Sequence, residues 1–267
     1  MSEKDIAVDD FAQAVRGILA RAGFIAPGVD EACVLVVDSS PLATYAAVAE
    51  HLLDADERRR AARFHFERDR STYLLAHALW RMVLGVCLGV EAAAVPLVRL
   101  PSGQPQLPGM RLATSLSRSR GWVAIAVGHA VTLGVDIECS PARIALDGLL
   151  TTICTPAEAA GMQELSIPVR EAALLALWTR KEALLKAFGT GLLESPSTLS
   201  AAMPGPVTAP PVSAYPPCRV RDLGLPAGVV GAFAAPVAVG LCRLCFSTGA
   251  RIMLAMDAGT GVSPSSP

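Results

Sequence analysis

The stretch Gly134–Glu138, with the sequence GVDIE, closes an apolar segment that is typical of a β-strand. Successive side chains of a strand point to opposite faces, so Asp136 and Glu138 are expected to share one face. Two carboxylates about 7 Å apart on one strand repel each other unless a cation lies between them. An Asp-x-Glu pair at a solvated strand end also occurs without any function, and this stretch alone leaves both interpretations open.

A second charged stretch, Trp178–Lys186 (WTRKEALLK), follows about forty residues later. The apolar pattern around it predicts a helix over Val169–Phe188. Trp178, Glu182 and Lys186 are four residues apart, so they lie in one stripe of this helix. A Glu–Lys pair at this spacing is commonly a surface pair that contributes about 0.3–0.5 kcal/mol, but the indole beside it indicates that the stripe is partly covered.

Together the two stretches supply three carboxylates, Asp136, Glu138 and Glu182, and two lysines, Lys181 and Lys186. A ligand set made only of oxygens suits a hard cation such as Mg²⁺, which keeps water molecules and bridges substrate phosphates. Lysines beside such an ion suit a phosphate or a pyrophosphate. This combination is typical of phosphoryl-type transfer, in which positioning and charge neutralisation supply most of the catalysis.

The two stretches resemble the paired signature of the Sfp-type 4′-phosphopantetheinyl transferases, in the same order and at the same separation. Two further segments agree with this family. Ala62–Arg70 (ARFHFERDR) is similar to its charged A-R-F-x-F-E-x-D-R stretch, and Ser115–Ser119 (SLSRS) stands where the family carries N-x-S-H-S. The resemblance covers roughly residues 55–192.

The resemblance implies an α+β fold of two similar halves related by a pseudo-twofold axis, each a small antiparallel sheet packed with a long helix. The expected N-terminal half, residues 1–133, lies on the coenzyme A nucleotide side. The C-terminal half, residues 134–256, carries the magnesium and transfer residues, and residues 257–267 form a flexible tail.

The local pattern predicts the elements of these halves. An amphipathic helix is expected around Phe11–Leu19, a strand over Val34–Val37 and a long helix over Asp69–Gly89. Trp122–Val127 and Val131–Ile137 are expected to be strands on either side of a turn. Residues 203–217 hold six prolines and predict a loop.

The resemblance also implies roles for the charged residues. Asp136, Glu138 and Glu182 would hold Mg²⁺. Lys186 and Lys181 would contact the phosphates of coenzyme A, the co-substrate. The partner would be an apo acyl or peptidyl carrier protein, and the enzyme would act as a monomer because both halves are present in one chain.

Glu182 and Lys186 would be the catalytic residues. Glu182, or a water molecule held by the ion, would help to deprotonate the carrier serine. That serine would attack the proximal phosphorus of the pyrophosphate, and adenosine 3′,5′-bisphosphate would leave. Ser117 and Arg118 would lie by the 3′-phosphate of the nucleotide, with Arg60 near it.

The nucleotide half departs from the family pattern. The usual Asn is Ser115, the usual His is Arg118, the Lys of the G-K-P turn is Gln104, and many relatives have Arg in place of His77. Arg118 is a permanent cation that can replace His at a phosphate, whereas Gln104 supplies no charge. These changes leave open a weaker or altered use of coenzyme A. They also leave open a protein that binds coenzyme A or a carrier without transfer.

Two other charged features have explanations without a site role. The arginine-rich segment 58–70 could face a carrier protein, but its interspersed acidic residues favour an internally paired helix face. Glu158 follows Thr155 at capping-box spacing, which explains the carboxylate as a helix cap.

The composition speaks against several classes of protein. A net charge of −1 and an aromatic content of 5% are untypical of a nucleic-acid binder, so no nucleic-acid partner is expected. The uncharged stretch Leu223–Cys242 is interrupted by prolines and predicts short strands rather than a membrane span, so no membrane partner is expected. No P-loop or G-x-G-x-x-G turn supports a different magnesium enzyme acting on a nucleotide diphosphate.

The cysteines and the first residues predict a cytoplasmic location. The seven cysteines are an odd number, which is typical of reduced thiols. Residues 1–5 lack the pattern of an export signal. Cys242 and Cys245 form a lone C-x-x-C without further ligands nearby, which favours two buried strand cysteines over a zinc site.

Overall fold

The computed structural model describes residues 3–202, 204–247 and 251–256. It is an α+β fold with two main sheets, as predicted. The helices are α1 Glu3–Ala22, α2 Ala46–Ala49, α3 Ala55–Ala61, α4 Glu67–Leu88, α5 Leu150–Ile153, α6 Pro156–Gln163 and α7 Ile167–Ala187. The strands are β1 Glu31–Asp38, β2 Val98–Arg99, β3 Pro105–Gln106, β4 Ala113–Ser119, β5 Trp122–Gly128, β6 Gly134–Cys139, β7 Pro206–Val207, β8 Cys218–Asp222, β9 Val229–Pro236, β10 Leu241–Phe246 and β11 Arg251–Ala255.

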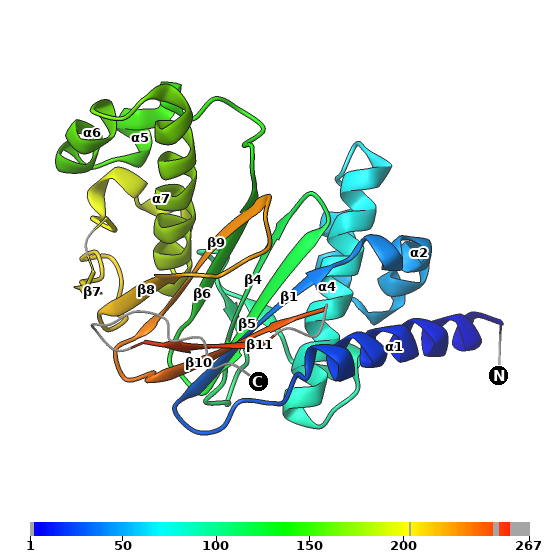
Figure 1. Ribbon diagram of the computed structural model, residues 1–267. Helices are drawn as coiled ribbons and strands as arrows, with labels where there is room; N and C mark the ends of the chain where they lie inside the picture. The colour runs from blue at the N-terminus through cyan, green and yellow to red at the C-terminus, as the bar shows by residue number, and fades with distance from the viewer. Residues whose placement is uncertain (1–2, 203, 248–250, 257–267) are drawn as a thin grey trace.

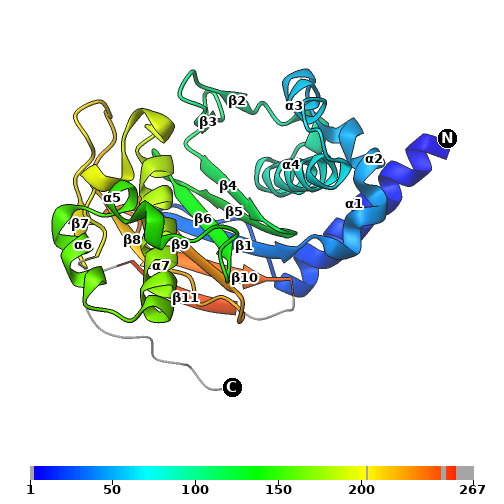
Figure 2. The same ribbon diagram turned by 90° about the horizontal axis from the view of Figure 1, so that it is seen from above.

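Each main sheet lies beside one long helix. The first sheet has the strand order β11-β10-β1-β5-β4 and the second has the order β6-β9-β8-β7. Figure 1 shows α4 beside the first sheet and α7 packed against the second, and Figure 2 shows the edge strands β4 and β6 side by side between the two helices. The short β2–β3 pair lies apart from both sheets.

Helix α4 is the core helix of the first half. It ends at Gly89, whose φ of 67° is the left-handed conformation that glycine adopts without steric cost. Its length and composition would allow it to cross a membrane, but 72% of its most apolar window is buried inside the protein. The apolar residues that recur along one face of this helix are all buried: Leu74, Leu75, Ala78, Leu79, Met82 and Val83.

Helix α7 packs directly on the strand that carries GVDIE. A Cβ atom on Gly134 would lie 1.8 Å from the carbonyl oxygen of Ala183, so only glycine allows this close approach. The contact brings β6 against the helix segment that carries Glu182 and Lys186. The two charged stretches of the sequence are therefore neighbours in space.

The strand order differs from the predicted division into halves near the C-terminus. Strands β5 and β6 follow one another in the chain but belong to different sheets, so they do not form a hairpin. Strands β10 and β11 return to the first sheet, where β10 pairs parallel to β1. Residues 241–246 and 251–255 thus complete the N-terminal sheet rather than a C-terminal one, because strand order depends on pairing between distant segments. The predicted tail, residues 257–267, lies outside the described residues.

The remaining predicted features are largely confirmed. The strand predicted at Val34–Val37 is the buried β1. Cys242 and Cys245 are free and buried on β10, as two strand cysteines. The described part of the proline-rich segment, residues 204–217, is mainly a loop, and the two-residue strand β7 is its regular part.

Candidate active site

A cleft of about 510 Å³ opens where the two halves meet. One wall is acidic and comes from β6, which supplies Asp136 and Glu138, together with Lys186 of α7. The facing wall is basic and aromatic, and its residues come from α4, the β2–β3 turn and β4. The cleft therefore lies between the two segments in which the sequence predicted metal and nucleotide contacts.

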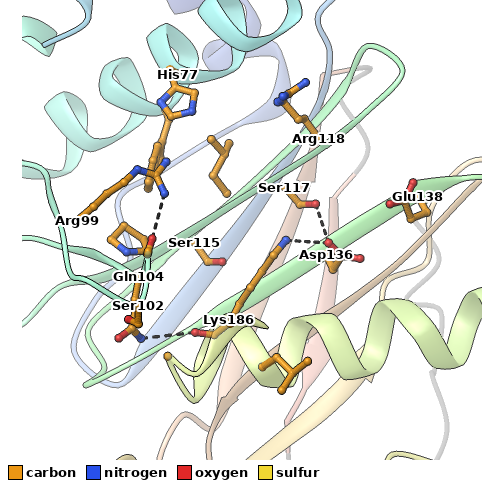
Figure 3. Close-up of a pocket in the computed structure, with 17 residues that line it drawn as sticks. His77, Arg99, Ser102, Gln104, Ser115, Ser117, Arg118, Asp136, Glu138 and Lys186 are labelled. Carbon is orange, nitrogen blue, oxygen red and sulfur yellow. Dashed lines mark hydrogen bonds and ion pairs between the residues drawn. The ribbon is translucent and has the colours of Figure 1, made fainter. Parts of the chain in front are cut away.

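Asp136 is the centre of the acidic wall. It is buried, and its Oδ1 atom lies 2.7 Å from the Lys186 Nζ atom and accepts a 2.8 Å hydrogen bond from Ser117 Oγ (Figure 3). Lys186 also donates to the carbonyl oxygen of Val135 at 2.9 Å. Lys186 is thus held in the cleft as predicted from its helix stripe, with its charge next to a carboxylate.

Glu138 and Glu182 complete the acidic group. Burial raises the pKa of Glu138, and the charge of Asp136 raises it further, although a hydrogen bond from Ser119 opposes the shift. Burial likewise raises the pKa of Glu182, and the charges of Asp136 and Glu138 add to that effect. Glu182 does not line the cleft itself. Glu138 and Glu182 nevertheless lie close enough to Asp136 for its charge to raise their pKa values, so the ionised forms of these two glutamates are costly without a cation.

The acidic group fits a hard cation. The Oδ2 atom of Asp136 is buried and has no hydrogen-bond partner among the described residues, which leaves a lone pair directed at an unfilled interaction. The atoms of Asp136, Glu138 and Glu182 that could ligate a metal are all carboxylate oxygens, the ligand type that Mg²⁺ prefers. Among the described residues no three such side chains already stand in a metal-binding cluster, and the Lys186 ammonium lies against Asp136.

The basic wall holds two arginines against aromatic rings. The guanidinium carbon of Arg118 lies 5.5 Å from the ring centroid of Phe64 and 5.7 Å from that of Tyr73. Arg99 lies 5.7 Å from the ring centroid of Trp80. Burial lowers the pKa of both guanidinium groups, although arginine remains charged near neutral pH. Such desolvated cations bind a phosphate more strongly than exposed ones.

Arg99 was missed in the sequence. Its position two residues before the Pro101–Pro105 turn was the available signal, because a cation beside that turn can stand in for the charge that Gln104 lacks. In the structure Gln104 forms hydrogen bonds that connect the turn to other segments. It donates to Thr132 Oγ1 at 3.1 Å and accepts a 2.8 Å bond from the Tyr215 hydroxyl, so it ties the turn to the other half of the molecule.

His77 is held by a buried ion-pair network. Its Nδ1 atom lies 2.8 Å from Oε1 of Glu57, whose Oε2 atom accepts a 2.5 Å bond from Arg81 Nε. Burial lowers the pKa of His77, while the Glu57 carboxylate opposes that shift. His77 lines the cleft, and its contact with Glu57 fixes the orientation of the imidazole ring.

The structure contradicts the predicted contact between Lys181 and coenzyme A. Its side chain has no exposed surface and points away from the cleft, into the core between α6 and α7. The ammonium donates to Ile153 O at 2.7 Å, Glu158 Oε2 at 2.5 Å and Pro196 O at 3.0 Å, which uses all three donors. A helix rotates by about 100° per residue, so Lys181 leaves the stripe that Glu182 and Lys186 share.

Two other sequence interpretations are resolved by position. Arg60 is exposed on α3 and does not line the cleft, although its charge lies close enough to Arg99 to lower the pKa of that side chain. Glu158 forms the predicted capping box with Thr155 and also pairs with Lys181. The arginine-rich segment contains internal pairs such as Arg70–Glu67, in agreement with a paired surface.

Comparisons with known proteins agree with the arrangement. Residues 132–205 match the family model of the 4′-phosphopantetheinyl transferase superfamily, and residues 40–130 match the N-terminal model of 4′-phosphopantetheinyl transferase. These two matches follow one another along the chain and together include both walls of the cleft.

The chain is similar to two curated proteins that are named as phosphopantetheinyl transferases. The chain is 32% identical over 145 residues to the 4′-phosphopantetheinyl transferase HetI of a Nostoc species, across 52% of this chain and 61% of the relative. It is also 32% identical over 158 residues to a phosphopantetheinyl transferase of a Thraustochytrium species, across 52% of this chain and 54% of that protein. The matched stretch thus spans between half and two thirds of each relative.

Proposed function

Because the chain belongs to the 4′-phosphopantetheinyl transferase superfamily, we propose that it moves the 4′-phosphopantetheine arm of coenzyme A to a serine of an apo acyl or peptidyl carrier protein. The reaction depends on Mg²⁺ and releases adenosine 3′,5′-bisphosphate. The observation that carries the proposal is a single cleft with carboxylates and Lys186 on one wall and the desolvated Arg118 and Arg99 on the other.

The two walls suit the two charged parts of coenzyme A. The 3′-phosphate is a negative group at one end of the nucleotide. Arg118 and Arg99 are permanent cations that are partly shielded from water, so they suit this phosphate. In this proposal the pyrophosphate binds at Lys186. Two of the three ammonium donors of Lys186 go to Asp136 and Val135, so among the described residues one donor remains for a phosphate oxygen.

In the transfer step the hydroxyl oxygen of the carrier serine bonds to the proximal phosphorus of the pyrophosphate. The bond between that phosphorus and the bridging oxygen breaks, and adenosine 3′,5′-bisphosphate leaves with the electron pair. The raised pKa of Glu182 suits its carboxylate to accept the serine proton, and because Glu182 does not line the cleft the proton would reach it through a water molecule. Lys186 neutralises charge that develops on the phosphoryl oxygens.

Asp136, Glu138 and Glu182 would hold the Mg²⁺ ion. When bound, the ion would neutralise charge on the pyrophosphate and on the three carboxylates. The orphaned Oδ2 atom of Asp136 and the raised pKa values of the other two carboxylates support this assignment. Lys186 and Arg118, which line opposite walls of the cleft, would orient coenzyme A between the two halves.

The direct test is intact-mass spectrometry of apo carrier proteins incubated with this protein, coenzyme A and Mg²⁺. We expect a mass gain of one phosphopantetheine on at least one carrier of a panel from fatty-acid, polyketide and peptide synthesis. EDTA and the Glu182→Ala variant serve as controls, and both are expected to remove the gain. A gain that persists in EDTA would contradict the metal assignment.

A second function on the same fold is a protein that binds coenzyme A or a carrier without transfer. The replacement of the family's nucleotide-site residues at Gln104, Ser115 and Arg118 motivates it. Coenzyme A binding without mass gain on any carrier would favour this alternative. The cytoplasmic location, the monomeric state and the lack of membrane and nucleic-acid partners stay predictions.

Replacing Arg118 by Ala is expected to weaken coenzyme A binding. The guanidinium lies against the rings of Phe64 and Tyr73 and lines the cleft. Its loss therefore removes a charge-assisted bond of about 1.5–3 kcal/mol, or roughly 10- to 100-fold in affinity. Isothermal titration with coenzyme A measures the change. Arg16→Ala, which removes the same charge from an exposed position on α1, is the matched control. Equal affinity of the two variants would place the nucleotide elsewhere.

A further inference from the structure

The two halves are joined by a row of serine hydroxyls. β4 is the edge of the first sheet and β6 is the edge of the second, and they belong to separate sheets. Three alternate residues of β4 accept hydrogen bonds from backbone N–H groups of β6. Ser115 Oγ accepts from Val135 at 3.1 Å, Ser117 Oγ from Ile137 at 3.3 Å and Ser119 Oγ from Cys139 at 3.1 Å. Serine oxygens thus replace the carbonyl oxygens of a neighbouring strand.

Two of these serines also reach the acidic wall. Ser117 Oγ donates to Oδ1 of Asp136 at 2.8 Å, and Ser119 Oγ donates to Oε2 of Glu138 at 2.7 Å. A hydroxyl has one proton, and the backbone N–H groups occupy its acceptor side, so the proton is directed at the carboxylate. Each carboxylate is therefore gripped through one oxygen by a residue from the opposite half of the molecule.

This arrangement leaves the second carboxylate oxygens for another ligand. For Asp136 the second oxygen, Oδ2, is buried and has no partner among the described residues. Carboxylates that ligate a metal are commonly oriented by such outer hydrogen bonds, and loss of one typically weakens metal affinity roughly 10- to 100-fold. The serine hydroxyls therefore connect the two sheets and also orient the Asp136 and Glu138 carboxylates.

We propose that Ser119 is a positioning residue for the cation site, because its hydroxyl holds the Glu138 side chain in the orientation that a divalent cation requires. The inference rests on the proposed function. Ser117 has the same relation to Asp136, but it lines the cleft and is a predicted nucleotide contact. Ser119 does not line the cleft, so its substitution separates metal positioning from coenzyme A contact.

The test compares Ser119→Ala with two other variants. Ser115→Ala removes an equivalent bond across the seam, but this hydroxyl has no carboxylate partner in the described part of the chain. Ser119→Thr keeps the hydroxyl. The probe is Mn²⁺ alone, titrated by the electron paramagnetic resonance signal of the free ion, and the titration is repeated with saturating coenzyme A.

In the titration without coenzyme A, Ser119→Ala is expected to weaken Mn²⁺ binding roughly tenfold, and Ser119→Thr should recover most of the loss. Ser115→Ala should stay near the wild type in this titration, and it is compared only here because Ser115 lines the cleft. In the transfer assay the Mg²⁺ concentration for half-maximal rate should rise in the same ratio, with a smaller effect at saturating metal. Unchanged Mn²⁺ affinity in Ser119→Ala, an equal loss in Ser115→Ala, or no Mn²⁺ binding by the wild type would each overturn the proposal.

The Mn²⁺ titration keeps this inference separate from the proposed reaction. A selective loss in Ser119→Ala without transfer to any carrier would support the positioning role and reject the transferase proposal. Transfer with unchanged Mn²⁺ affinity in Ser119→Ala would do the reverse.

Discussion

Glu182→Gln is expected to abolish transfer while making the metal-free protein more stable. Burial raises the pKa of Glu182, and the charges of Asp136 and Glu138 raise it further, even though Lys186 opposes them. The ionised side chain is therefore costly to keep in the folded protein. The glutamine side chain has nearly the same shape and no charge, so the substitution removes this cost. It also removes the carboxylate that would ligate the metal and accept the proton.

The stability gain should depend on pH. The pKa of Glu182 is higher in the folded state than in the unfolded state, so the penalty is present above the folded pKa and disappears as the pH falls through it. Thermal unfolding in EDTA should show Glu182→Gln above the wild type at pH 8, with the difference shrinking toward pH 4. Each kcal/mol recovered shifts the midpoint by roughly 2–4 °C for a chain of about this size.

The loss of transfer should be about 10²–10⁴-fold, the typical worth of a general base, and larger if the ion is lost as well. Glu164→Gln is the matched control because it neutralises an exposed glutamate outside the cleft. It should keep both transfer and the wild-type midpoint. Normal transfer by folded Glu182→Gln, or a midpoint that falls at pH 8, contradicts the assignment. Glu182→Ala should lose transfer likewise and stay folded.

Lys181→Met is expected to destabilise the protein by about 3–5 kcal/mol, because it leaves a buried carboxylate without its cation. The Lys181 side chain is 0% exposed and that of Glu158 is 3% exposed. Glu158 keeps the backbone N–H donors of Thr155 and Ala201, at 2.8 Å each, which places the expected loss toward the lower end of that range. The charge of Lys181 lowers the pKa of Glu158 against the effect of burial, so its removal favours protonation.

Chemical denaturation of Lys181→Met, with coenzyme A kinetics at low temperature, tests this structural role. The KM for coenzyme A should stay near the wild-type value, whereas Lys186→Met should raise it because Lys186 lines the cleft. The double variant Lys181→Met/Glu158→Gln should recover part of the stability, since no charge is then left buried. A stable Lys181→Met protein with a raised KM would restore Lys181 to the coenzyme A site.

Much of the site follows from local periodicity. Alternation along β6 correctly predicted that Asp136 and Glu138 share a face, because a strand has a period of two. Helical spacing placed Glu182 and Lys186 in one stripe for the same kind of reason. The basic wall was only partly predictable: Arg118 lies in the cleft, Arg60 does not, and Arg99 was not singled out.

The sequence by itself determined which residues are carboxylates and cations and which faces they occupy on their own strand or helix. It also located α4 and α7 to within two residues at each end. These properties depend on neighbours within one or two turns of the chain. The tertiary structure alone decided that β10 joins β1, that Lys181 meets Glu158 rather than the cleft, and that Ser119 meets Glu138. Each of these contacts joins separate elements, and no local period encodes which face of one element another element will cover.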